Sequence, residues 1–145
     1  MQTLISQEQL DHLNKQLSII DDKRKRTIEQ YFSKSPREQH EFNNLIDNYV
    51  NGVKQFIKEA EKSSNKTNAP FVFIGCTVQL EDAANGEVME FHVVDPLQGR
   101  VEENDVSYLS PVGRALLLKK VGDEIKVKTP GGTVHYKINA IEFRE

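Results

Sequence analysis

The sequence predicts an α+β protein in which an antiparallel helical hairpin precedes an antiparallel β-sheet with one short helix. In the first half, apolar residues recur every three or four positions along two segments, and a Ser-Pro-x-Glu helix start separates the segments. In the second half, runs of β-branched and aromatic residues alternate with turn sequences, which is typical of antiparallel strands. A polar linker, KSSNKTNAP, lies between these patterns, so we expect domains at residues 1–68 and 69–145.

The first helix should begin after Ser6, because Ser6 and Gln9 have the spacing of a capping box. Its apolar residues then follow the alternating spacing of three and four that is typical of a coiled-coil seam, with a weaker stretch near its end. The expected seam positions are Leu10, Leu13, Leu17, Ile20, Arg24, Thr27 and Tyr31.

The second helix should begin at Pro36, with Ser35 as its N-cap and Glu38 completing a second capping box. Two helices of similar length joined by a few residues should fold back on each other, giving a hairpin about 40 Å long. The expected buried stripe of the second helix is Phe42, Leu45, Tyr49, Val53 and Phe56, with Ile46, Val50 and Ile57 beside it.

The second half contains four strand patterns and one helix pattern. Asn85-Gly86 predicts a two-residue type I′ turn between the first two strands, and Pro-Gly-Gly predicts the turn between the last two. Ser110 and Pro111 predict the start of the helix. The expected elements are strands at residues 71–80, 88–95, 124–129 and 133–143, and a helix at residues 112–118.

The composition indicates a soluble protein with a modest core, since 37% of residues are hydrophobic and 28% are charged. The net charge of −3 argues against a general nucleic-acid binder that neutralises phosphates. Cys76, the single cysteine, lies in an apolar run, so we expect a core residue and not a nucleophile. Without a signal peptide or a membrane-spanning run, we expect a cytoplasmic protein with no membrane partner.

No catalytic constellation is visible in the sequence. The four histidines show no pair at metal-ligand spacing, and there is no CxxC, Walker loop or GxGxxG motif. His92 and His135 lie in strand patterns, where we expect them on a face of the sheet. We therefore expect a binding or regulatory protein that is not an enzyme by itself and has no cofactor.

A set of motifs runs through the second half in a fixed order. Ser-Pro-Val-Gly-Arg-Ala-Leu at residues 110–116 is followed by Gly122-Asp123 before a strand, and then by Thr-Pro-Gly-Gly at residues 129–132. Together with FVFIGCTVQL, they make residues 71–143 resemble the C-terminal domain of the bacterial GreA/GreB transcript cleavage factors. The resemblance implies an FKBP-like domain without prolyl isomerase activity, preceded by an antiparallel coiled coil.

The resemblance also implies bacterial RNA polymerase as the partner. In that family the C-terminal domain docks near the mouth of the polymerase secondary channel, and acidic residues at the coiled-coil tip help to hold a catalytic Mg²⁺ in the polymerase. The polymerase-binding residues implied by the matched motifs are Ser110, Pro111, Arg114, Asp123, Pro130 and Gly131.

The tip departs from the family pattern. When Glu41-Phe42 is aligned with the end of that pattern, Ser35 stands where an Asp is expected and Glu38 stands where the Glu is expected. Lys34 and Arg37 would oppose a bound cation, and each arm is about one and a half turns shorter, which reduces its reach by about 8 Å. We therefore expect no metal site and no strong stimulation of cleavage from the tip residues, which are Ser35, Arg37, Glu38 and Glu41.

Two alternatives stay open. The protein could be an active cleavage factor with Glu38 or Glu41 as a metal ligand, or a self-associating coiled-coil protein whose Gre-like domain serves another partner. A monomer is the expectation for the Gre-like reading.

A run of four basic residues lies on the first helix. In the family a basic patch on this arm faces the nascent RNA, so the resemblance implies contact with RNA or polymerase. A solvated helix face balanced by Asp21 and Asp22 is the alternative. The four residues are Lys23, Arg24, Lys25 and Arg26.

Overall fold

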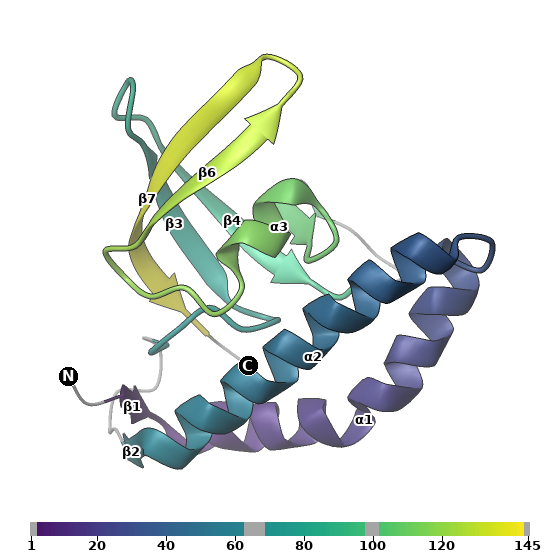
Figure 1. Ribbon diagram of the computed structural model, residues 1–145. Coiled ribbons are helices and arrows are strands. Elements are labelled where there is room, and N and C mark those ends of the chain that lie inside the picture. Colours follow the sequence, from purple (N-terminus) through teal and green to yellow (C-terminus); the bar gives the residue numbers. More distant parts are fainter. Residues whose placement is uncertain (1–2, 63–68, 98–101, 144–145) are drawn as a thin grey trace. The chain divides into compact units, whose positions relative to one another are not determined.

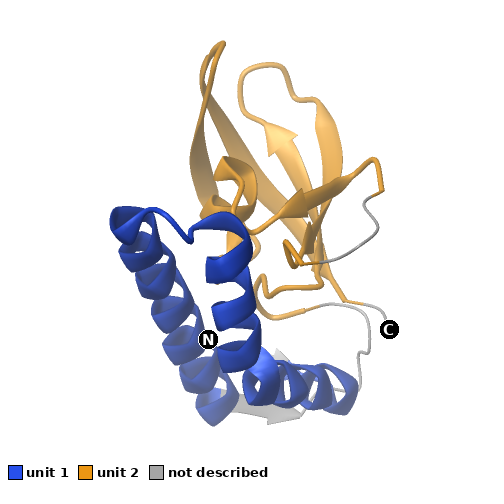
Figure 2. Ribbon diagram, turned by 90° about the vertical axis from the view of Figure 1, so that its right-hand side faces the viewer, with its two compact units in different colours: residues 1–63 blue, residues 64–145 orange. Residues whose placement is uncertain are grey.

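The computed structural model describes residues 3–62, 69–97 and 102–143. The chain divides into two compact units, residues 1–63 and residues 64–145, which are coloured separately in Figure 2 and are described here one at a time. The first unit is a helical hairpin, and the second is a curled sheet with a short helix (Figure 1). No helix in the described ranges is long and apolar enough to cross a membrane.

The first unit consists of α1 (Gln7–Tyr31) and α2 (Pro36–Glu59), which run antiparallel (Figure 1). The predicted capping box of α1 is confirmed, since the Gln9 N–H donates to Ser6 Oγ at 3.1 Å and the Ser6 N–H donates to Gln9 Oε1 at 3.3 Å. A short parallel pair, β1 (Thr3–Ile5) and β2 (Ala60–Lys62), joins the two ends of this unit. The sequence did not predict this pair, because strands of three residues carry too little pattern.

The buried seam of the hairpin differs from the predicted one at a few positions. Tyr31 is exposed, because α1 ends there and Phe32 contacts Phe42 in its place, with ring centroids 5.4 Å apart. Ile46, and not Leu45, takes the buried position in α2. The buried seam is Gln9, Leu13, Ile20 and Thr27 in α1, and Phe42, Ile46, Tyr49 and Val53 in α2.

The second unit is a five-stranded sheet in the order β5-β4-β3-β7-β6. Every pairing is antiparallel except β4 with β5, which is parallel, so the sheet is mixed at this edge and not wholly antiparallel as predicted. The elements are β3 (Thr77–Asp82), β4 (Val88–Val94), β5 (Asp105–Ser107), α3 (Pro111–Leu116), β6 (Glu124–Thr129) and β7 (Gly132–Glu142).

The predicted strand over residues 71–80 begins only at Thr77. Gly75 has φ 109°, and the Cys76 N–H donates to the Phe73 carbonyl at 3.0 Å, so the chain turns there. Val72 exchanges two hydrogen bonds of 2.8 Å with the segment after α3, at Leu118 and Lys119. The apolar run at residues 71–74 is therefore buried core that lies outside the sheet.

The predicted type I′ turn at Asn85-Gly86 is also wrong. Such a turn needs positive φ at both central residues, and only Gly86 has it, at 75°. The hairpin closes at the hydrogen bond from the Asp82 N–H to the Glu87 carbonyl, 2.8 Å, which leaves a four-residue loop. The Asn85 side chain instead accepts from the Glu87 N–H at 2.9 Å.

The sheet contributes much of the core of the second unit. The alternation predicted for β6 is confirmed, with Ile125 and Val127 buried. In β7, a register shift opposite Gln79 and Leu80 inserts one extra residue, so Ile138 and Ile141 are both buried although they are three residues apart. Cys76 is buried, as predicted.

Candidate functional site

The hairpin tip, residues 32–41, is held by hydrogen bonds to one carbonyl group. The Phe32 carbonyl accepts from the Ser35 N–H at 3.3 Å and from Gln39 Nε2 at 2.8 Å. The Phe32 N–H donates to the Ile28 carbonyl at 2.9 Å and ends α1. The backbone polar groups at this reversal therefore find their hydrogen-bond partners within the tip and the last turn of α1.

Ser35 caps α2, but Glu38 does not complete the predicted capping box. Ser35 Oγ accepts from the Glu38 N–H at 3.3 Å, as expected for an N-cap. The reciprocal bond would need the Ser35 N–H, which donates to Phe32 instead. Among the hydrogen bonds of the described residues, none involves the exposed Glu38 carboxylate.

The other tip acid, Glu41, has a cationic neighbour. Its Oε1 lies 3.2 Å from Arg37 Nε, and both side chains are largely exposed. An exposed pair of this kind stabilises the helix by less than about 1 kcal/mol, but it places a positive charge beside the carboxylate. In residues 3–62, 69–97 and 102–143, no three His, Cys, Asp or Glu side chains form a metal-binding group.

The four basic residues of α1 do not form one surface. Arg24 is mostly buried and crosses to α2, where its Nη1 donates to Asp47 Oδ1 at 2.8 Å and to Asn43 Oδ1 at 3.4 Å. Lys25 and Arg26 are exposed, and Lys23 is half-buried. Arg24 therefore contributes to pairing of the helices, and an RNA or polymerase contact would fall to Lys25 and Arg26.

Two of the implied polymerase-binding residues have clear structural roles. Ser110 is the N-cap of α3: its Oγ accepts from the Gly113 N–H at 3.1 Å and donates to the Ser107 carbonyl at 2.7 Å. Asp123 Oδ2 accepts from the Lys120 N–H at 2.8 Å and closes the turn before β6. These hydrogen bonds account for a serine at position 110 and an aspartate at position 123 without a binding partner.

The other four residues of that set are exposed. Pro111 occupies the first turn of α3, and Arg114 lies in the last turn of the same helix. Pro130 and Gly131 form the turn between β6 and β7. Exposed side chains are the ones that a partner can reach, so Arg114 is the most informative residue to mutate.

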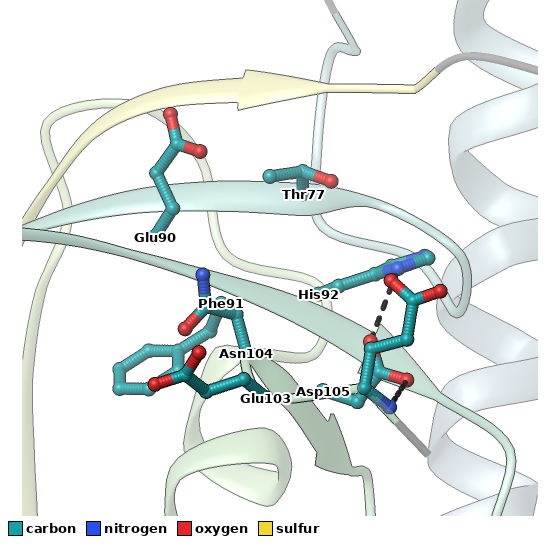
Figure 3. A pocket seen from close by; sticks show the side chains of 8 residues that line it. Thr77, Glu90, Phe91, His92, Glu103, Asn104 and Asp105 are labelled. Atoms are coloured by element: carbon teal, nitrogen blue, oxygen red, sulfur yellow. Dashed lines mark hydrogen bonds and ion pairs between the residues drawn. The ribbon is translucent and has the colours of Figure 1, made fainter. Parts of the chain in front are cut away.

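A polar hollow at the β4–β5 edge was not predicted. His92 lies there with Nδ1 3.4 Å from Asp105 Oδ1 (Figure 3). Its Nε2 lies 3.1 Å from the Gly75 carbonyl oxygen. The sequence indicated only a histidine on the sheet face, because Asp105 is 13 residues away on a strand whose parallel pairing was not foreseen. The hollow is lined by Thr77, Glu90, Phe91, His92, Glu102, Glu103, Asn104 and Asp105.

Comparison with known proteins decides the family. Residues 66–143 match the family model described as "Transcription elongation factor, GreA/GreB, C-term". The chain belongs to the GreA/GreB family. The fold predicted from the resemblance, a helical hairpin followed by a β-sheet domain, is confirmed.

Two curated relatives show how far the similarity of sequence extends. Transcription elongation factor GreA of Syntrophus aciditrophicus is 39% identical over 67 residues, which cover 46% of this chain and 42% of that protein. The protein of the same name from an Anaeromyxobacter species is 33% identical over 101 residues, which cover 69% of this chain and 61% of the relative. The chain thus spans about half the length of the curated relatives it matches.

A solved structure shares the fold. The prokaryotic transcription elongation factor GreA/GreB from Nitrosomonas europaea superposes with a TM-score of 0.51 at 22% identity. The superposition covers 98% of this chain and 100% of the other. Both Gre units, the hairpin and the sheet domain, are therefore present in this chain.

Proposed function

We propose that this protein is a Gre-type transcription factor that binds bacterial RNA polymerase through residues 69–145, with residues 1–68 as a hairpin at the secondary channel. The observation that carries the proposal is the family match over residues 66–143. The protein acts as a modulator of the polymerase and is not an enzyme by itself. Its effect is on transcription elongation, or on the access of other factors to the channel.

We also propose that it does not strongly stimulate transcript cleavage. Three features of the tip support this. Ser35 stands where the family has an acid and is engaged as a helix cap, Arg37 lies beside Glu41, and Lys34 adds a further positive charge. Mg²⁺ prefers carboxylate oxygens, and neighbouring cations weaken its binding.

One observation favours the second candidate, an active cleavage factor. The Glu38 carboxylate is exposed and takes no part in the capping of α2. It is therefore available to approach a metal ion held by the polymerase, and Glu38 is the residue on which cleavage activity would depend.

Binding of the intact protein to core RNA polymerase tests the main proposal. We expect association at micromolar concentration, weakened by Arg114→Ala, which removes an exposed charge from α3. Lys54→Ala, an exposed residue of α2, is the control and should bind as the wild type does. Absence of any association by the wild-type protein would contradict the proposal.

Cleavage in backtracked elongation complexes separates the two candidates. We expect little shortened RNA above the level of polymerase alone. Efficient shortening that is lost in Glu38→Gln, and kept in the exposed control Glu29→Gln, would establish the cleavage factor instead. Sedimentation at several concentrations addresses self-association, and a concentration-independent monomer is the expected result.

A further inference from the structure

A second hollow, of about 410 Å³, lies where β7 extends beyond the end of β3. The turns of the β3–β4 and β6–β7 hairpins are at this end of the sheet (Figure 1). The pairing of β3 with β7 ends at Asp82 and Tyr136, and the Ala83 N–H then donates to the His135 carbonyl at 2.9 Å. We call this feature the β7 hollow, and its lining residues are Asp82, Ala83, Ala84, Thr133, Val134 and His135.

The β7 hollow is mostly apolar, and one of its walls is held by hydrogen bonds. Four of its six lining residues carry methyl groups, namely the two alanines, Thr133 and Val134. On the side of the β3–β4 loop, Asp82 Oδ1 accepts from the Ala84 N–H at 2.8 Å, and the Asp82 carbonyl accepts from the Gly86 N–H at 2.8 Å. The hollow is therefore formed before a ligand arrives, and it suits a small apolar group.

Two lysines lie on the sheet face beside the β7 hollow. In the pairing of β6 with β7, Lys126 is directly opposite His135 and Lys128 is directly opposite Thr133, so the four side chains share one face. Both lysines are exposed, and they are about 6.6 Å apart along β6. In the described part of the chain, neither of them takes part in an ion pair. Residues 125–141 contain three lysines and no acidic residue, so this end of the sheet is cationic.

The positions of the hollow and the lysines define the ligand that fits them. Neighbouring strands are about 4.8 Å apart, so one short peptide reaches from the lysines of β6 across β7 into the hollow. Carboxylates of the peptide then meet Lys126 and Lys128, and an apolar side chain enters the hollow. Asp82, in the wall of the hollow, repels a carboxylate there and so favours this orientation.

A nucleic acid fits the same surface less well. Proteins that bind single strands combine a long positive track with aromatic rings on which bases stack, and the only ring at the β7 hollow is the imidazole of His135. Residues 69–145 contain 12 acidic residues against 8 basic ones, so a longer phosphate chain meets carboxylates beyond the two lysines. A short acidic peptide covers the lysines alone.

We propose that the β7 hollow, together with Lys126 and Lys128, is a docking site for an acidic segment of a partner protein that carries an apolar residue among its carboxylates. The site uses neither Arg114 nor the hairpin tip, so it goes beyond the proposed function. Its test does not involve polymerase, and a failure of either proposal is therefore distinguishable from a failure of the other.

Amide chemical shifts of the ¹⁵N-labelled full-length protein, titrated with synthetic peptides, test the hollow. We expect acetyl-EELEE-amide to shift the amides of Ala83, Ala84 and residues 126–135, with a Kd on the order of 1 mM because the contacts are few and exposed. The peptide acetyl-EESEE-amide lacks the apolar group and should bind about fivefold more weakly. The oppositely charged acetyl-KKLKK-amide should not bind there. Equal affinity for all three peptides would refute the proposal.

Charge reversal tests the two lysines. Lys126→Glu and Lys128→Glu should each weaken binding of acetyl-EELEE-amide about fivefold, because an attraction between exposed charges becomes a repulsion. Lys119→Glu, at an exposed lysine of the same unit, is the matched control and should bind as the wild type does. Unchanged affinity in both variants would contradict the site.

Two further outcomes would overturn the proposal. Lysines on an edge strand also keep a sheet from pairing with other chains, and if that is their whole role the wild-type protein will show no shifts with acetyl-EELEE-amide. Tighter binding of a short oligothymidylate at the same amides would instead identify a nucleic-acid contact.

Discussion

Gly113 lies where the neighbouring backbone leaves no room for a side chain. A Cβ at this position would lie 2.1 Å from the Ser107 carbonyl oxygen and 2.9 Å from the Tyr108 Cα, both of them backbone atoms. In this chain the segment at residues 110–116 therefore includes a glycine that lets α3 approach β5 closely. It is a packing requirement, and it needs no partner to explain it.

Gly113→Ala should destabilise the second unit by about 1–3 kcal/mol, since backbone atoms must move to admit the methyl group. Gly131→Ala is the matched control, because its nearest neighbour would be Thr129 Oγ1 at 3.8 Å. Urea unfolding followed by circular dichroism measures both. Equal stability of the two variants would show that α3 does not pack against Ser107 in this way.

Arg24 shows at the level of the element how a charged residue can stabilise helix pairing. It links α1 to Asp47 and Asn43 of α2 from a mostly buried position. We expect Arg24→Ala to lower the free energy of unfolding by about 1 kcal/mol, because Asp47 loses a charge-assisted partner. The neighbouring Lys25→Ala should change the free energy of unfolding by no more than a few tenths of a kcal/mol. Thermal and urea unfolding of the two variants make this comparison.

The same pair of variants separates the two roles of the basic run. If nascent RNA or polymerase contacts this arm, Lys25→Ala should weaken that interaction without loss of stability. A stability loss of similar size in both variants would contradict the assignment of Arg24 to the hairpin and Lys25 to the surface.

The cap of α3 has a consequence for the polymerase experiment. Ser110→Ala removes both the bond from the Gly113 N–H and the bond to Ser107, so we expect a loss of about 1 kcal/mol in stability. Ser110→Thr keeps the hydroxyl group and should retain much of the stability that Ser110→Ala loses. Reduced polymerase binding by Ser110→Ala alone would therefore report a damaged helix start, whereas the same loss in a stably folded Arg114→Ala would report a contact.

On the scale of the whole molecule, Cys76 reports on opening of the second unit. Burial raises the pKa of its thiol far above the ordinary value, although the hydrogen bond from the Phe73 N–H acts in the opposite direction. Under native conditions the thiol should therefore react with a thiol reagent only through opening of the core. Reaction as fast as in the urea-unfolded chain would contradict this placement.

The Cys76 thiol also makes the stability of the folded protein depend on pH, in a direction that can be worked out. In the unfolded chain the thiol ionises above about pH 8.5, whereas in the folded protein it keeps its proton. The unfolded state then binds fewer protons, so stability falls as pH rises past that value, by about 1 kcal/mol per pH unit from this residue. Below it, the thiol is neutral in both states and contributes nothing to the pH dependence. Cys76→Ala should show a shallower decline between pH 9 and pH 10 in urea unfolding.

Much of the fold could be predicted from local pattern. The cap at Ser6, the start of α2 at Pro36, the cap at Ser110 and the alternation in β6 all depend on residues within a few positions of each other. The Gre resemblance rests on motifs of the same local kind. Such signals survive in the folded protein because caps and strand alternation are satisfied by near neighbours.

What the sequence by itself determined is therefore the order of elements, the two-unit organisation it suggested and the membership of a Gre-type family. Only the tertiary structure decided which residues are available for function. Arg24 turned inward to Asp47, Glu38 was left out of its expected cap, and His92 met Asp105 across a parallel pairing. The first and third of these contacts join residues 23 and 13 positions apart, and the second depends on the Phe32 carbonyl, a competing backbone acceptor for the Ser35 N–H. Local pattern does not report them, because their partners are chosen by how the chain folds back on itself.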